Sequence, residues 1–368
     1  MPMKRTNHHL QRRQRLARII KDEGSDAVLI TNPVNVTYLT GFSGDSSYLV
    51  LTPKRSLLIS DARFTEQIEQ ECPGLEAHIR PPSQSLPKAV VEVLRKLKLR
   101  TLGFESSHLS VAEWEGYREA AGPLDWKPGA DRVEKLRAVK DSSELDEIRE
   151  AIAIAERAFA MFTAMLRPED REKDLSDAME MYVRRAGGTC TSFPTIVAVE
   201  ERAALPHAPP TDKSVADGNL VLVDWGAAGR FYKSDLTRVL ATRTISPKLQ
   251  KVYEVVLKAQ QQAIRRIRPG ATGREVDAEA RSVIARAGFG QFFGHGLGHG
   301  IGLQVHEAPT LRQNSDWVLQ PGMVVTVEPG IYLPGWGGVR IEDDVLVTPD
   351  GHEVLTSVAK EPIPTVEF

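Results

Sequence analysis

Hydrophobic and polar positions follow different patterns before and after about residue 128. In the first part, short runs rich in Val, Leu and Ile alternate with helical patterns, at 26–31, 47–52 and 56–60 for the runs and at 62–71 and 87–98 for the helices. Alternating strands and helices predict an α/β layer domain. Residues 121–132, with two prolines and two glycines, are predicted to form a connector. We therefore predict an N-terminal α/β domain at 1–128 and a second domain at 129–368.

The basic N-terminal stretch is predicted to form an amphipathic helix that packs Leu10, Leu16, Ile19 and Ile20. It lacks the apolar segment and the small-residue cleavage site of a secretory signal. No run of 18 or more apolar residues indicates a membrane span. These features predict a cytoplasmic location and exclude a membrane as the partner.

The second part begins with a long helical pattern. Asp141 and Glu144 have capping-box spacing, and one apolar face then repeats at steps of three and four residues, through Leu145, Ile148, Ile152, Ala155, Phe159 and Phe162. Helical patterns at 249–268 and 273–287 follow, interleaved with strand-like runs at 195–199, 219–225, 230–242, 322–328 and 339–348. This predicts an α+β domain with antiparallel strands.

Composition narrows the function classes. The 368 residues carry a formal net charge of -2, which gives no electrostatic reason to expect nucleic acid or an anionic membrane as the partner. The two cysteines, Cys72 and Cys190, lie far apart and form no CxxC motif, so neither a disulfide framework nor a zinc knuckle is indicated. A small molecule or a peptide is the expected ligand.

Two predicted hairpins each carry a pair of carboxylates. In 220–240, a turn at Gly229 and Arg230 would place Asp224 opposite Asp235, with Cβ atoms about 5 Å apart. In 323–347, a turn near Gly335 would place Glu328 opposite Glu342. Carboxylates this close in a buried sheet repel each other unless a cation lies between them.

A glycine-rich segment with three histidines, His295, His299 and His306, lies between the hairpins. Its glycines would let the backbone approach a crowded site closely. Taken singly, each histidine or aspartate is explained as an ordinary turn, core or surface residue. Taken together, four acidic residues in apolar strands would leave several buried charges unpaired without metal.

One imidazole and four carboxylates form a hard, oxygen-rich ligand set. We predict two divalent metal ions, with manganese as the first choice and cobalt or zinc as alternatives. Two ions held about 3.5–4 Å apart by shared carboxylates would activate water, so hydrolysis is the expected reaction class.

These residues resemble those of the pita-bread metallopeptidases, which comprise Xaa-Pro aminopeptidase, prolidase and methionine aminopeptidase, with creatinase as a relative without metal. The resemblance covers nearly the whole chain, and its specific segments are 192–212, 223–238, 294–309, 326–334 and 338–344. Segments 35–52 and 60–67 resemble the creatinase-type N-terminal domain, which favours the proline-specific branch. The family fold implied for 129–368 is the pita-bread domain with pseudo-two-fold symmetry.

The resemblance also implies roles for individual residues. Asp224 would bind one ion, Asp235 and Glu342 would bridge both, and His299 and Glu328 would complete the coordination. His207, His295 and His306 match active-site histidines that contact the substrate and stabilise the tetrahedral intermediate, and Glu328 would also transfer a proton. Phe193, Tyr332 and Arg340 match the substrate pocket. Val199 and Glu200 stand where the family often has Ser-Gly, which concerns the wall of that pocket.

The expected activity is hydrolysis of the Xaa-Pro bond at the N-terminus of small peptides with proline in the second position. The alternative is an Xaa-Pro dipeptidase that acts only on dipeptides. Another amidohydrolase or aminopeptidase on the same scaffold, and a peptide-binding module without turnover, are further alternatives. Family members with two domains are commonly dimers, so a homodimer is expected.

Overall fold

The computed structural model describes residues 8–361 and 363–366. The chain divides into two compact units, Met1–Arg137 and Ala138–Phe368, each of which is described by itself. The division lies after Arg137, whereas the predicted boundary lies after residue 128. The difference arises because strand β6 (Asp125–Gly129) pairs with a strand of the first unit, and the helix α6 (Arg132–Ala138) follows directly.

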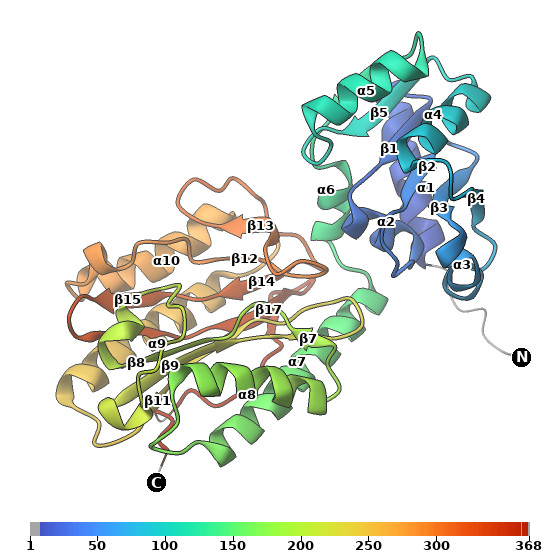
Figure 1. Ribbon diagram of the computed structural model, residues 1–368. Coiled ribbons are helices and arrows are strands. Elements are labelled where there is room, and N and C mark those ends of the chain that lie inside the picture. Colours follow the sequence, from blue (N-terminus) through green and yellow to red (C-terminus); the bar gives the residue numbers. More distant parts are fainter. Residues whose placement is uncertain (1–7, 362, 367–368) are drawn as a thin grey trace, which may run out of the picture. The chain divides into compact units, whose positions relative to one another are not determined.

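The first unit is a six-stranded sheet with the strand order β4-β3-β2-β1-β5-β6. β1 pairs antiparallel with β2 and parallel with β5, so the sheet is mixed. The other strands are β1 (Ala27–Ile30), β2 (Tyr48–Leu51), β3 (Ser56–Asp61), β4 (Glu76–Arg80) and β5 (Thr101–Glu105). The helices are α1 (His8–Asp22), α2 (Pro33–Thr40), α3 (Thr65–Glu71), α4 (Leu86–Leu97) and α5 (Val111–Ala121). This α/β layer agrees with the prediction (Figure 1).

The prediction that residues 121–132 form a connector was wrong for the middle of this segment, because residues 125–129 form the edge strand β6. Trp126 in this strand is buried, and Pro128 pairs with Phe104 of β5. Proline cannot donate to a ladder, and an edge strand has one side on which no donor is needed. The composition of the segment therefore concealed a strand that only the neighbouring sheet stabilises.

The predicted N-terminal helix is present as α1. Leu16 and Ile20 are fully buried, whereas the prediction for Leu10 was wrong, since 43% of this residue is exposed. Arg12 takes the buried position of that turn, with its guanidinium over the ring of Tyr38. The first seven residues of the predicted stretch lie outside the described residues.

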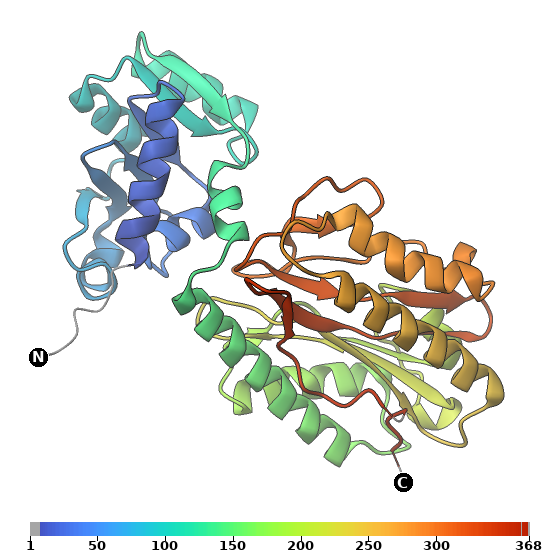
Figure 2. The same cartoon turned by 180° about the vertical axis from the view of Figure 1, so that it is seen from behind.

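The second unit consists of two similar halves, each with two helices followed by antiparallel strands. The first half contains α7 (Ser142–Met165), α8 (Glu172–Arg185), β7 (Cys190–Thr191), β8 (Ile196–Val199), β9 (Leu220–Trp225), β10 (Ala227–Ala228) and β11 (Leu236–Ala241). The second contains α9 (Pro247–Arg266), α10 (Gly273–Arg286), β12 (Gly298–Gly300), β13 (Glu307–Leu311), β14 (Val324–Val327), β15 (Gly330–Leu333), β16 (Gly337–Arg340), β17 (Asp343–Val347) and β18 (His352–Val354). This repetition is the pseudo-two-fold symmetry of the pita-bread fold (Figures 1 and 2).

Helix α7 begins with the predicted capping box. Asp141 accepts from the backbone N–H groups of Ser143 and Glu144, and the Glu144 carboxylate accepts in return from the N–H of Asp141. The predicted apolar face of this helix packs against the first half of the sheet, where the ring of Phe159 stacks on Trp225 at 4.1 Å between centroids.

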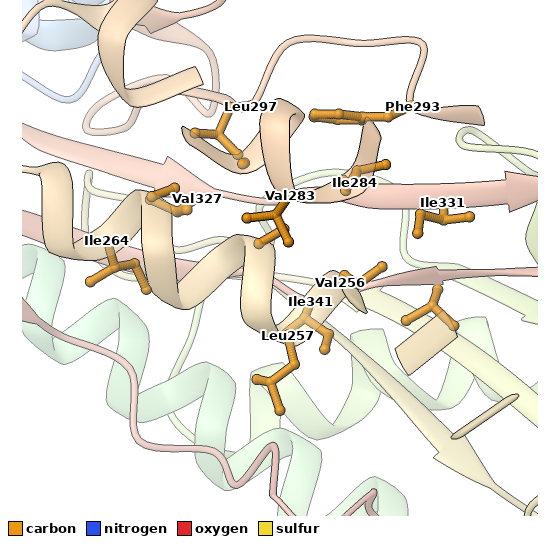
Figure 3. Packing of buried hydrophobic residues seen from close by; sticks show 14 of the residues in the cluster. Val256, Leu257, Ile264, Val283, Ile284, Phe293, Leu297, Val327, Ile331 and Ile341 are labelled. Atoms are coloured by element: carbon orange, nitrogen blue, oxygen red, sulfur yellow. The ribbon is translucent and has the colours of Figure 1, made fainter. Parts of the chain in front are cut away.

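The helices α9 and α10 cover the strands from the other side, as Figure 2 shows. Val256, Ile264 and Ile284 on these helices pack against residues of the strands such as Val327 and Ile331 (Figure 3). These residues form a continuous apolar layer between the two helices and the strands. No helix among the described residues has the length and hydropathy needed to cross a membrane.

Candidate metal centre

Strand β9 sends alternate side chains to opposite faces of its sheet. Val221, Val223 and Trp225 pack against α7 and α8, whereas Leu220 and Leu222 face the core under α9 and α10. Asp224 has the parity of the second group, so it projects from the same face as Leu222. All six residues of β9 are buried, which places a carboxylate inside the sheet.

The predicted pairing of Asp224 with Asp235 was wrong by two residues, because Thr237 lies opposite Asp224. The turn centres on Arg230 and Phe231, one residue later than predicted, and Gly229 N donates to Tyr232 O at 2.9 Å across it. A shift of two residues preserves the face of the sheet. Asp235 therefore has the same orientation as Thr237, and Asp224 is one of the charges that act on Asp235.

The second hairpin has the predicted register. Val327 pairs with Asp343 before Glu328, and Gly330 pairs with Arg340 after it, which places Glu328 level with Glu342. The turn at 334–336 is short, and Gly335 adopts a positive φ of 75° there. A tight turn with one glycine that must be left-handed leaves little freedom in register, which explains why this prediction was correct.

The glycines beside His299 are required by close backbone approach, as predicted. A Cβ atom on Gly298 would lie 2.1 Å from the carbonyl oxygen of Thr326, and one on Gly300 would lie 2.2 Å from that of Ala308. His299 thus sits in a short strand, β12, between β13 and β14. Its backbone N–H donates to Thr326 Oγ1 at 3.1 Å, which fixes the strand against the second carboxylate hairpin.

One cavity of about 720 Å³ brings together all of the predicted site residues. They are Phe193, His207, Asp224, Asp235, His295, His299, His306, Glu328, Tyr332, Arg340 and Glu342. Every one of them belongs to the second unit, although they come from segments up to 149 positions apart (193 to 342). The sequence prediction had missed other parts of the wall, among them Arg312 and the prolines on both sides of His207 and Ala208.

Three of these groups are close enough to share a metal ion. Ligand atoms of Asp235, His299 and Glu342 all lie within 4.8 Å of one another. His299 Nε2 lies 3.7 Å from Asp235 Oδ2 and 3.3 Å from Glu328 Oε1. This arrangement brings a fourth group, Glu328, to the same imidazole.

The carboxylates repel one another in the protein without metal. Burial, followed by the charge of Glu342, raises the pKa of Asp235 well above its ordinary value. Burial and then Glu328 raise the pKa of Glu342 in the same way. Burial also raises the pKa of Asp224, although the nearby Arg340 opposes this. Divalent cations would reverse these shifts, because a metal ion favours the ionised carboxylate.

The histidines differ in their surroundings. Burial lowers the pKa of His295 and of His306. Burial also acts to lower the pKa of His299, but the hydrogen bond with Glu328, the charge of Glu328 and the hydrogen bond to Gly300 together raise that pKa. Conversely, burial acts to raise the pKa of Glu328, and the same hydrogen bond lowers it. His299 and Glu328 thus form an ion pair in the absence of a competing cation.

The residues fit a divalent metal centre. Asp224 Oδ1 and Glu342 Oε1 are buried and have no hydrogen-bond partner among the described residues. An unpaired buried carboxylate oxygen is costly, and a metal ion would satisfy both oxygens. The donors are carboxylates and one imidazole, which suit manganese, iron, cobalt or zinc, and they include no thiolate.

The side chain of Arg340 lies at one side of the candidate metal centre and is held there by hydrogen bonds to other protein groups. Its guanidinium donates to Asp224 Oδ2 at 2.5 Å and to the hydroxyl of Tyr332 at 2.9 Å, and it is only 2% exposed. His295 Nε2 lies 2.9 Å from the same hydroxyl. The predicted substrate role of Arg340 is untested, but its hydrogen bonds tie the first carboxylate hairpin to the second.

Two further groups at the centre had not been predicted. Asp344 Oδ2 accepts from the backbone N–H of Asp235 at 3.1 Å, and burial raises the pKa of Asp344 to about 8. Thr237 is fully buried beside Glu342. Asp344 had a sequence signal as the third acidic residue of Glu342-Asp343-Asp344, whereas a threonine in a strand carries none.

The departure from the family pattern at Val199 and Glu200 does not change the cavity wall. Glu200 adopts a φ of 53°, and its carboxylate accepts from the backbone N–H of Asn219 at 2.6 Å. Neither Val199 nor Glu200 lines the cavity.

The second unit places a cluster of carboxylates and an imidazole in one cavity, which is the arrangement typical of metallohydrolases. Residues 146–349 match metallopeptidase family M24, and residues 12–139 match the creatinase/prolidase N-terminal domain. The chain belongs to metallopeptidase family M24.

Individual relatives extend over nearly the whole chain. An Xaa-Pro dipeptidase of Pyrococcus furiosus is 34% identical, over 95% of this chain and 99% of its own. The structure of an Xaa-Pro dipeptidase from Bacillus anthracis is 39% identical, with a TM-score of 0.92 over 97% of this chain and 99% of its own. That of an X-Pro aminopeptidase from Thermotoga maritima is 35% identical, with a TM-score of 0.89 over 96% and 100%.

Proposed function

We propose that the protein is a metal-dependent Xaa-Pro dipeptidase, which hydrolyses the bond before proline in dipeptides. The observation that carries the proposal is the convergence of Asp235, His299 and Glu342 within 4.8 Å in one cavity with Phe193 and Tyr332. The names of relatives support the substrate class, because those from Pyrococcus furiosus and Bacillus anthracis are Xaa-Pro dipeptidases.

Dipeptidase replaces aminopeptidase as our first choice, since several related proteins bear that name. An Xaa-Pro aminopeptidase stays the second candidate, because the similar structure from Thermotoga maritima has that name. The two activities differ only in whether peptide may continue beyond the proline.

The ligand set that we propose is Asp224, Asp235, His299, Glu328 and Glu342 for two divalent ions, with manganese as the first choice. When bound, such ions supply Lewis-acid activation of water and of the scissile carbonyl group. Among the oxygens of these carboxylates, Asp224 Oδ1 and Glu342 Oε1 have no hydrogen-bond partner among the described residues and would be free to bind the ions. Asp344 supports Asp235 from behind through its backbone N–H.

The remaining polar groups act on the substrate. His306 lies beside His299, with 4.3 Å between the ring centroids, and it donates to the developing oxyanion together with His207. Burial lowers the pKa of His306, which favours the neutral imidazole, and the N–H of a neutral imidazole can donate to the oxyanion. Glu328 would accept the proton that the attacking water loses and deliver it to the departing prolyl nitrogen. His295 contacts the substrate beside Tyr332.

Proline specificity follows from the chemistry of the imide bond. The prolyl nitrogen has no hydrogen and its ring fixes φ, so a cleft that requires an N–H donor at this position rejects it. Phe193 and Tyr332 in the cavity wall provide an apolar surface for the ring.

A substrate series tests the proposal. The metal-free protein is assayed with Ala-Pro, Ala-Pro-Ala and Met-Ala-Ala after addition of manganese, cobalt or zinc. Hydrolysis of Ala-Pro alone supports the dipeptidase, and equal or faster hydrolysis of Ala-Pro-Ala favours the aminopeptidase. Cleavage of Met-Ala-Ala alone would refute proline specificity. Binding of Ala-Pro without turnover under every metal would make the chain a peptide-binding module. The homodimer and the cytoplasmic location stay predictions.

A further inference from the structure

Thr237 of the first hairpin makes two side-chain hydrogen bonds to the second hairpin, one of them to the proposed ligand Glu342. Its hydroxyl donates to Glu342 Oε2 at 2.7 Å and accepts from Arg340 Nε at 3.1 Å. One hydroxyl has a single proton to donate, and here it is committed to the carboxylate while a lone pair is committed to the guanidinium. Thr237 is fully buried, so water does not compete for either bond.

The bonds of Thr237 and Arg340 occupy one oxygen of each of two carboxylates and leave the other one unpaired. Arg340 binds Asp224 Oδ2, and Thr237 binds Glu342 Oε2. The opposite oxygens, Asp224 Oδ1 and Glu342 Oε1, are the ones that have no partner among the described residues. A carboxylate that is held at one oxygen presents the other in a fixed direction.

The backbone places the side chain of Thr237 on the face of the sheet that carries Asp224 and holds it next to Glu342. It lies opposite Asp224 in the β9–β11 ladder, and its carbonyl accepts from the backbone N–H of Glu342 at 3.2 Å. The adjacent residues Leu236 and Arg238 point to the other face of the sheet, because side chains alternate along a strand. Thr237 is thus one of the residues through which the first hairpin contacts the second.

A similar threonine occurs in the second hairpin. Thr326 is also fully buried, and its hydroxyl oxygen lies 3.4 Å from Glu328 Oε1 and accepts from the backbone N–H of His299. Each half of the unit therefore places a threonine hydroxyl beside a glutamate of the centre. The contact of Thr237 is the shorter of the two.

We infer that Thr237 is a positioning residue that orients Glu342 for metal binding, through a hydroxyl that also holds Arg340. This inference rests on the ligand roles proposed above. Partners of metal ligands typically contribute about 10- to 100-fold to metal affinity, because they fix the orientation of the ligand.

Calorimetric titration of the metal-free protein with manganese tests the inference without reference to catalysis. Thr237→Val keeps the shape and the β-branched side chain but removes the hydroxyl, and we expect manganese to bind about 10- to 100-fold more weakly. Thr237→Ser retains the hydroxyl and should bind within a few-fold of the wild type. Thr237→Ala provides a second variant without hydroxyl if valine prevents folding.

Thr242→Val is the matched control. Thr242 follows the same strand, is also buried, and donates to the carbonyl of Gly218 at 3.0 Å, away from the cavity. Unchanged manganese affinity in Thr237→Val and Thr237→Ala would overturn the inference, as would an equal loss in Thr242→Val. A wild type that binds manganese but cleaves no Xaa-Pro peptide would refute the proposed function alone. A wild type that binds no manganese would refute both.

Discussion

Arg340 donates to Asp224 Oδ2 across 2.5 Å, and the two side chains are almost completely buried. Without metal, this guanidinium places a positive charge directly on Asp224, one of a group of carboxylates that repel one another. The pair therefore stabilises the metal-free protein by partly compensating buried negative charge.

Replacement of Arg340 by methionine should destabilise the metal-free protein by about 3–5 kcal/mol, because a buried charge loses its partner. Urea unfolding in the presence of a chelator measures this effect. Added manganese should restore part of the lost free energy of unfolding. Arg312→Met is the control, since Arg312 lines the same cavity but is exposed. Equal stability of the Arg340 and Arg312 variants would contradict the prediction.

Asp235→Asn should lower both metal content and Ala-Pro hydrolysis. Asparagine keeps the shape but loses the charge that two cations would share, and we expect a loss of at least about 100-fold in kcat/KM. Metal content is measured by atomic absorption after dialysis. Asp350→Asn, at an exposed position, should leave both quantities unchanged. Full metal stoichiometry together with full activity in Asp235→Asn would rule out a bridging role.

Metal-free protein should become less stable as the pH rises from about 6.5 to about 8. Burial raises the pKa of Asp344 from 3.8 to about 8, so its contribution to stability is fully present only below 3.8 and decreases over the whole interval up to about 8, which includes this range. The raised pKa of His299 acts in the same direction. The lowered pKa values of Glu328, His295 and His306 act in the opposite direction, but only below their ordinary values of 4.5 and 6.5.

Manganese should stabilise the protein more at pH 8 than at pH 6.5, because the metal binds ionised carboxylates and competes less with protons at the higher pH. Thermal unfolding with chelator or manganese at several pH values in this range measures both effects. A metal-free protein whose stability rises steadily over the range would be inconsistent with these pKa shifts.

Gly298→Ala should destabilise the protein by about 1–3 kcal/mol, because the added Cβ would overlap the backbone of Thr326. The displaced strand carries His299, so manganese affinity should also fall. Gly294→Ala serves as the control within the same segment, since a Cβ atom there meets nothing within 4 Å. Chemical denaturation and manganese titration of both variants check the prediction, which fails if the two alanines have the same effect.

Local patterns in the sequence determined much of the fold and the composition of the site. The capping box at Asp141 and the apolar face of α7 involve residues at most a few positions apart, and both were predicted correctly. The register of the second hairpin was also predictable, because a short turn around Gly335 specifies it locally. Acidic residues in apolar strands have no stable place without a cation, which is why they indicated the metal centre.

Tertiary structure decided what depends on distant neighbours. Strand β6 is held by its pairing with β5, and the turn of the first hairpin lies one residue later than predicted, next to β10, which pairs with the distant β7. Thr237 carries no distinctive local pattern, and the acidic run that contains Asp344 does not show which of its members faces the site. Both residues acquire a role only where the two hairpins meet. Residue type and short-range spacing thus indicated which groups are the proposed ligands, whereas long-range packing determined which oxygen of Asp224 and of Glu342 has no hydrogen-bond partner among the described residues.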